Sequence, residues 1–182
     1  EINYANNSIG EKHFPFEDVP PLDLVVYSLG YLSDGNLHYP EWWEPQQMVD
    51  WLRSAYPVSQ INVRWRTEIY HKKNWFGGPT EYPYPDTSGV NFFLLDLRKD
   101  MAKNSSAGTR YFALVDDGGM PPDNRVRGAA LKILAEVGWA RTGVPGTSSH
   151  YRDSWDNDGS YGDAYGGHEL GHMYGLNHYL CP

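Results

Sequence analysis

Apolar and polar positions predict alternating strands and helices over the first 115 residues of the chain. Residues 22–29, LDLVVYSL, form an apolar run of β-favouring side chains, which is typical of a buried strand. Residues 44–57, EPQQMVDWLRSAYP, predict a helix, because apolar positions recur at helical spacing between Pro45 in the first turn and Pro57 at the stop. Residues 60–70 alternate between apolar and polar side chains, which predicts a strand with one solvent-exposed face.

The same kind of pattern continues to residue 115 and weakens beyond it. Helical spacing of apolar side chains returns at residues 90–101, and RYFALV at residues 110–115 predicts another buried strand. This order of elements favours a twisted, mostly parallel sheet with helices packed on it. Residues 71–88 are rich in Gly, Pro and aromatic side chains and predict a long loop, whereas residues 125–137 fit either a short helix or a short strand.

The last part of the chain predicts an edge strand and a C-terminal helix. The helix covers about residues 163–174, with Asp163 as its N-cap. The predicted fold class is α/β (α+β): a mostly parallel sheet with an antiparallel edge strand, two packed helices and this final helix. The edge strand consists of Gly138, Trp139, Ala140, Arg141 and Thr142.

Length and charge restrict the possible architectures and partners. A chain of 182 residues predicts one domain, 1–182, with residues 1–20 as an N-terminal arm. The net charge of −8, with acidic residues spread along the chain, argues against nucleic acid as a partner. No run of about 18 apolar residues is present, so we expect no membrane span. The sequence leaves the oligomeric state open.

A pair of histidines on the last helix predicts a metal site. His168 and His172 are four residues apart, so on a helix their rings project from the same face and can share one ion. Glu169 lies one step around the helix, beside the metal, where a carboxylate can take a proton from metal-bound water. The pair alone is equally compatible with ordinary surface or core histidines of a helix; Glu169 and the residues that follow favour a catalytic centre.

A glycine and a third histidine complete the expected site. Gly175 can adopt a left-handed conformation at little cost, end the helix and turn the chain so that His178 returns as a third ligand. Three imidazole nitrogens favour Zn²⁺ over Ca²⁺ or Mg²⁺, which prefer oxygen ligands. Because three protein ligands leave one position open, we expect a single catalytic zinc ion with an activated water.

The stretch HELGHMYGLNH, residues 168–178, resembles the HExxHxxGxxH signature of the metzincin zinc endopeptidases at every defined position. The resemblance implies hydrolysis of peptide bonds in a polypeptide or glycoprotein substrate, with Glu169 as the general base. It also implies that the substrate pairs with an antiparallel edge strand, here assigned to residues 138–142. Residues 155–172 are similar to secreted bacterial and fungal metzincin-like proteins, which implies an extracellular location.

One feature of metzincins has no counterpart in these residues. Metzincins carry a methionine-containing turn after the third histidine, whereas all four methionines here precede His178. We therefore expect residues 21–175 to form the N-terminal subdomain, residues 176–182 to begin a C-terminal subdomain, and the Met-turn to lie in a further segment. Cys181 is the only cysteine, and we expect any disulfide partner in that same segment.

Other functions and ions remain alternatives. The aromatic segment at residues 71–85 is compatible with a zinc-holding module that binds a glycan or glycopeptide without cleaving it. A metal-dependent amidase acting on small substrates is the second alternative. The acidic segment at residues 153–163 does not support calcium binding, because alignment to an EF-hand loop places Ser154 and Tyr165 at ligand positions.

Overall fold

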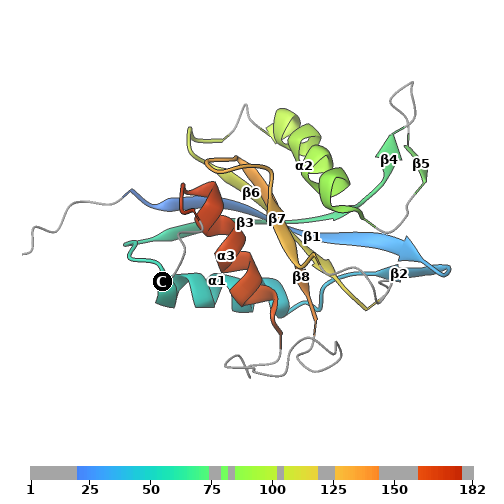
Figure 1. Cartoon of the computed structure of the whole chain (residues 1–182), viewed down its shortest axis with the longest axis horizontal. Helices are drawn as coiled ribbons and strands as arrows, with labels where there is room; N and C mark the ends of the chain where they lie inside the picture. Colours follow the sequence, from blue (N-terminus) through green and yellow to red (C-terminus); the bar gives the residue numbers. More distant parts are fainter. Residues whose placement is uncertain are drawn as a thin grey trace, which may run out of the picture.

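Eleven helices and strands make up the part of the chain that the structure describes (Figure 1). This computed structural model describes residues 20–73, 79–81, 85–101, 105–118, 126–143 and 160–177. In chain order, the elements are β1 (Leu22–Ser33), β2 (Asn36–His38), α1 (Glu44–Ala55), β3 (Ile61–Ile69), β4 (Lys72–Lys73), β5 (Pro79–Glu81), α2 (Thr87–Met101), β6 (Arg110–Asp116), β7 (Gly128–Ala130), β8 (Val137–Thr142) and α3 (Gly162–Met173).

The main sheet is open, mostly parallel and partly antiparallel. The strands β3, β1, β6, β8 and β7 follow one another across it, and β2 forms an antiparallel hairpin with the end of β1. The pairs β1–β3, β1–β6 and β6–β8 are parallel, whereas β7 runs antiparallel to β8. A separate small sheet joins β4 and β5. The predicted mixed α/β class with a mostly parallel sheet is therefore confirmed. The three strands predicted at residues 22–29, 60–70 and 110–115 correspond to β1, β3 and β6, and the first two predicted helices correspond to α1 and α2.

The helices cover both faces of the sheet. Figure 1 shows α2 on one side and α1 with α3 on the other. The alternation of side chains along β1 explains the two layers, because successive residues of a strand point to opposite faces. Val25 and Tyr27 pack with Val90 of α2, while Leu24 and Val26 pack with Met48 of α1. Leu170 and Met173 of α3 belong to the second of these cores.

The predicted edge strand at residues 138–142 is wrong in one respect. These residues form a strand, but β8 lies between β6 and β7 and every residue of it is buried. The edge is β7, which comes from the segment whose secondary structure the sequence left open. A strand of Gly128, Ala129 and Ala130 is too short to show a hydrophobic period, so its pairing with β8 is not visible in the pattern.

The N-terminal end of α3 differs from the prediction. The helix begins at Gly162 with Tyr161 as its N-cap, so the assignment of Asp163 as the N-cap is wrong. Asp163 instead lies in the first turn and is buried.

Within the described ranges, every helix is too short or too polar to cross a bilayer.

Candidate metal centre

The helix α3 brings two imidazole rings to one point. The Nε2 atoms of His168 and His172 lie 3.1 Å apart, and the rings are nearly perpendicular, with an interplanar angle of 87°. Two nitrogens bound tetrahedrally to one zinc ion at about 2.0–2.1 Å would lie roughly 3.3 Å apart. The separation of the two Nε2 atoms therefore fits a shared ion without a change of helix geometry.

A backbone carbonyl sets the chemical form of His172. Its Nδ1 lies 2.7 Å from the carbonyl oxygen of Leu176. A carbonyl oxygen only accepts hydrogen bonds, so Nδ1 must carry the proton, and in the neutral ring the lone pair is on Nε2. Histidine ligands of metals usually have such a partner on the second ring nitrogen, because it fixes the ring and raises ligand basicity.

The carbonyl of Leu176 is in place because of the way α3 ends. Gly175 has a φ of 99°, and its N–H donates to the carbonyl oxygen of His172 at 3.0 Å. The N–H of Leu176 donates to the carbonyl oxygen of Gly171 at 2.9 Å, which completes a Schellman motif. The predicted helix stop at Gly175 is confirmed. The same turn that ends the helix thus directs the Leu176 carbonyl to the ring of His172.

The third predicted ligand, His178, lies outside the described residues. Within the ranges that are described, no group of three His, Cys, Asp or Glu side chains is arranged to hold a metal ion. The donor set that can be assessed is therefore the pair of imidazoles on α3, and that pair fits zinc in chemistry and separation.

Glu169 connects α3 to the edge of the sheet. Its carboxylate accepts a hydrogen bond from the backbone N–H of Ala130 at 2.7 Å. The side chain is half-buried and lies beside the histidine pair on the same helix. A partner in β7 was not foreseeable, because a backbone N–H carries no signal in the sequence.

A cleft of ≈ 790 Å³ opens over these side chains. A space of this size accommodates a ligand as large as a short peptide segment. Residues from α1, the start of β7 and α3 form its walls, and the side chains of His168, Glu169 and His172 all reach it. The lining includes Trp51, Ala55, Tyr56, Val126, Arg127, Gly128, Tyr165, His168, Glu169, His172 and Leu176.

A polar cluster anchors the beginning of β7 beside this cleft. Arg127 donates from Nη1 to Asp117 Oδ2 at 2.6 Å, and its guanidinium lies over the ring of Tyr161, 5.0 Å from the centroid. The hydroxyl of Tyr161 donates to the same carboxylate oxygen and accepts from Arg127 at 3.0 Å. Burial raises the pKa of Asp117, and the nearby Arg127 opposes that rise. We call these three residues the β7 anchor.

A hydrogen bond also joins α1 to α3. The hydroxyl of Tyr56, at the C-cap of α1, donates to the carbonyl oxygen of Gly167 at 2.8 Å. Burial raises the pKa of Tyr56 to about 12, so the hydroxyl keeps its proton at neutral pH. The bond places α1 directly against the turn of α3 that precedes His168.

The sequence predicted candidate side chains on α3 but not the residues that surround them. Residues 138–142, predicted to bind substrate, lie in β8 and pair with a strand on each side. The β7 anchor and Ala130 were not predicted, since they meet the site only through tertiary contacts. Comparison with protein-family models, with curated proteins and with solved structures finds no match to this chain.

Proposed function

We propose that this protein is a zinc-dependent endopeptidase with a metzincin-like site. The observation that carries the proposal is the convergence of His168 and His172 at one point, with the carboxylate of Glu169 next to them in an open cleft. The complete HExxHxxGxxH spacing at residues 168–178 supports the same function. By the same resemblance we propose an extracellular location.

The zinc ion would be held by Nε2 of His168 and Nε2 of His172, with His178 as the proposed third ligand. When bound, zinc supplies a Lewis acid that polarises a carbonyl and lowers the pKa of a bound water to about 7. The hydrogen bond from His172 Nδ1 to the Leu176 carbonyl keeps Nε2 available as the ligand atom.

Glu169 is the proposed general base. Its carboxylate would accept a proton from the attacking water and later deliver that proton to the nitrogen of the leaving amine. The hydrogen bond from the Ala130 N–H supports this role, because it fixes the half-buried carboxylate at the wall of the cleft.

The edge strand β7 is the proposed binding surface for the substrate backbone. Arg127 and Leu131 make their backbone hydrogen bonds toward β8, to Arg141 and Val137. Because the direction alternates along a strand, the N–H and C=O groups of Gly128 and the C=O group of Ala130 point away from β8, whereas the Ala130 N–H is bonded to Glu169. An extended peptide can pair with these groups, as in β-strand addition.

A substitution of Glu169 by Ala tests the proposal. We expect the Glu169→Ala variant to retain stoichiometric zinc after dialysis and to lose at least 100-fold in the rate of protein hydrolysis, because the proton acceptor is removed while the histidines remain. The measurements are metal analysis and mass spectrometry of the digestion products of an unfolded protein. Unchanged cleavage by the variant would contradict the proposal.

A matched control is Glu136→Ala. Glu136 forms an exposed ion pair with Arg98 at 2.6 Å, and such pairs contribute little to stability. This variant should cleave normally. A series of peptides of increasing length separates an endopeptidase from an amidase for small substrates: if only dipeptides or acyl amides are cut, the role of β7 is wrong.

A further inference from the structure

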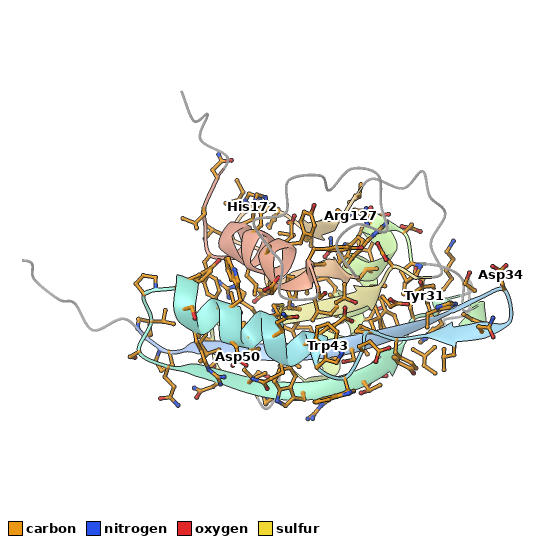
Figure 2. The ribbon with its side chains drawn as sticks, turned by 90° about the horizontal axis from the view of Figure 1, so that it is seen from below. Tyr31, Asp34, Trp43, Asp50, Arg127 and His172 are labelled. Carbon is orange, nitrogen blue, oxygen red and sulfur yellow. The ribbon has the colours of Figure 1, made fainter. Side chains whose placement is uncertain are left out.

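A second pocket lies at the opposite end of α1 from the cleft. Its volume is ≈ 370 Å³, and it is formed by β1, β3 and the turn that leads into α1. In Figure 2, Trp43 marks this end of the helix and Asp50 lies further along it. We call it the tryptophan pocket. Its lining consists of Ser28, Tyr39, Pro40, Trp42, Pro45, Gln46, Trp65, Arg66 and Thr67.

Two tryptophan side chains are exposed at the tryptophan pocket. Trp42 is 86% exposed and Trp65 is 43% exposed. A monomer gains stability by burying such large apolar side chains, so exposed aromatic side chains gathered at a concave site indicate a surface that binds something.

The turn that carries Trp42 is held firmly on both sides. The N–H of Glu41 donates to Oε2 of Glu44 at 2.8 Å, and the N–H of Glu44 donates to the carbonyl oxygen of Glu41 at 3.1 Å. Glu44 is itself buried. Pro40 and Pro45 restrict the backbone before and after Trp42. The exposed indole is therefore presented by a pre-organised frame, which lowers the entropy lost on binding.

Polar side chains alternate with the aromatic ones around the pocket. Ser28 and Thr67 face each other across the β1–β3 pair and bring two hydroxyl groups together. Gln46 donates from Nε2 to Asp50 at 3.0 Å, which leaves its Oε1 as an acceptor. Arg66 is the only charged side chain in the lining, and its Nη1 donates to the carbonyl oxygen of Trp65 at 2.9 Å.

We infer that the tryptophan pocket binds a carbohydrate, with a pyranose ring against an exposed indole and its hydroxyl groups on the polar side chains. A sugar ring has an apolar face and a rim of hydroxyl groups that donate and accept, and this pocket offers both kinds of partner. A proline-rich peptide also uses aromatic side chains, but it requires an extended groove and few side-chain hydrogen bonds. Here four polar side chains surround one recess.

The inference does not depend on the proposed peptidase. The cleft uses Trp51 and Ala55 of α1, whereas the tryptophan pocket uses Pro45 and Gln46 at the start of the same helix. Removal of the zinc ion, or the Glu169→Ala substitution, should leave carbohydrate binding unchanged. A failure of one proposal is therefore distinguishable from a failure of the other.

The test is a binding titration of the full chain, by calorimetry and tryptophan fluorescence, with three neutral probes: chitotriose, mannotriose and cellotriose. We expect saturable binding of at least one trisaccharide, and a loss of at least tenfold in affinity for Trp42→Ala and for Trp65→Ala. Because Trp42 contributes little buried surface, its variant should fold normally, as checked by circular dichroism.

Phe92→Ala is the matched control, since Phe92 is 62% exposed and belongs to α2, which packs on the other face of the sheet. This variant should bind as the parent protein does. Three results would overturn the inference: no binding of any of the three trisaccharides, binding that both tryptophan variants leave intact, or binding of a decaproline peptide in place of the sugars.

Discussion

At the scale of single residues, the candidate metal centre depends on one backbone turn. Gly175 ends α3, and the chain then presents the carbonyl of Leu176 to Nδ1 of His172. Gly175, which has no side chain that could bind a metal, thereby determines which nitrogen of the proposed ligand His172 carries the lone pair. The orientation of the His172 ring on α3 therefore depends on the turn that follows the helix.

Gly175→Ala should therefore affect both stability and metal binding. A φ of 99° is unfavourable for alanine, and the new Cβ would lie 3.0 Å from Cδ2 of Leu134. We expect the free energy of unfolding to fall by about 1–3 kcal/mol. Loss of the Leu176 contact should weaken zinc binding roughly 10- to 100-fold. Urea unfolding and competition with a chelator measure the two effects.

The control for this variant is Gly35→Ala in the β1–β2 hairpin. Gly35 also has a positive φ, 77°, but its Cβ position is open and far in the chain from α3. This substitution should lower stability without a change in zinc affinity. Equal loss of zinc affinity in both variants would show that general destabilisation, rather than the turn, is responsible.

At the scale of elements, the position of β7 decides the shape of the cleft. This strand has only three residues, and it makes backbone hydrogen bonds to β8 on one side. The β7 anchor, Asp117, Arg127 and Tyr161, attaches its beginning to β6 and to the start of α3. The bond from Ala130 to Glu169 attaches its end to the middle of α3. A short strand is thereby held at both ends.

Removing the β7 anchor should loosen the strand. Arg127→Gln leaves the Asp117 carboxylate mostly buried without its cation, so we expect a loss of about 1.5–3 kcal/mol in unfolding free energy. Tyr161→Phe should lower it by about 1 kcal/mol. In both variants the amide hydrogen of Ala130 should exchange faster with solvent. KM for peptides should rise more than kcat falls, because β7 is the proposed binding surface for the substrate.

A double variant tests whether these residues act together. If Arg127 and Tyr161 stabilise the same carboxylate, the double variant should lose an amount of unfolding free energy that differs from the sum of the two single losses by at least about 0.5 kcal/mol. Strict additivity, with unchanged exchange at Ala130, would mean that the three residues do not form one anchor.

At the scale of the whole molecule, three buried or half-buried carboxyl groups meet at one end of the sheet. Asp116 and Asp117 stand where β6 ends, and Glu44 begins α1 nearby. Burial is the main cause that raises the pKa of each of these groups, and the charge of Asp116 raises the pKa of Glu44 further. By contrast, hydrogen bonds lower the pKa of Asp23 and Asp86.

These shifts predict how stability depends on pH. The folded chain holds protons on the raised groups more tightly than the unfolded chain, whose ordinary pKa values are 3.8 for Asp and 4.5 for Glu. The stability they contribute is therefore present at acidic pH and is lost as pH rises through their folded-state pKa values. Asp23 and Asp86, whose pKa values are lowered, have the opposite effect. The stability that they contribute is present above pH 3.8 and is lost as pH falls below that value.

We expect maximal stability at mildly acidic pH and a decline toward neutral pH. Urea unfolding in the presence of a chelator, from pH 3.8 upward to neutral pH, measures this decline. Asp116→Asn should make the decline shallower, since it removes one of the three carboxyl groups. A wild-type stability that increases over this range would contradict the assignment of burial as the dominant cause.

The sequence by itself determined the local elements and the placement of the two histidines on one face of α3. Strands and helices with a clear hydrophobic period, such as α1 and β3, formed where the pattern predicted them, because the period reflects which face is buried. The spacing of His168 and His172 requires only helical geometry to bring their rings together. Gly175 requires only local backbone sterics to end the helix.

Only the tertiary structure decided which strand forms the edge of the sheet and what surrounds the site. The sequence indicated β8 as the edge, but the pairing of β7 with β8 moved the edge to a segment with no periodic pattern. The partner of Glu169, the β7 anchor and the tryptophan pocket all join residues far apart in the chain. Such contacts depend on how strands and helices pack in space, and the order of residues along one segment does not encode them.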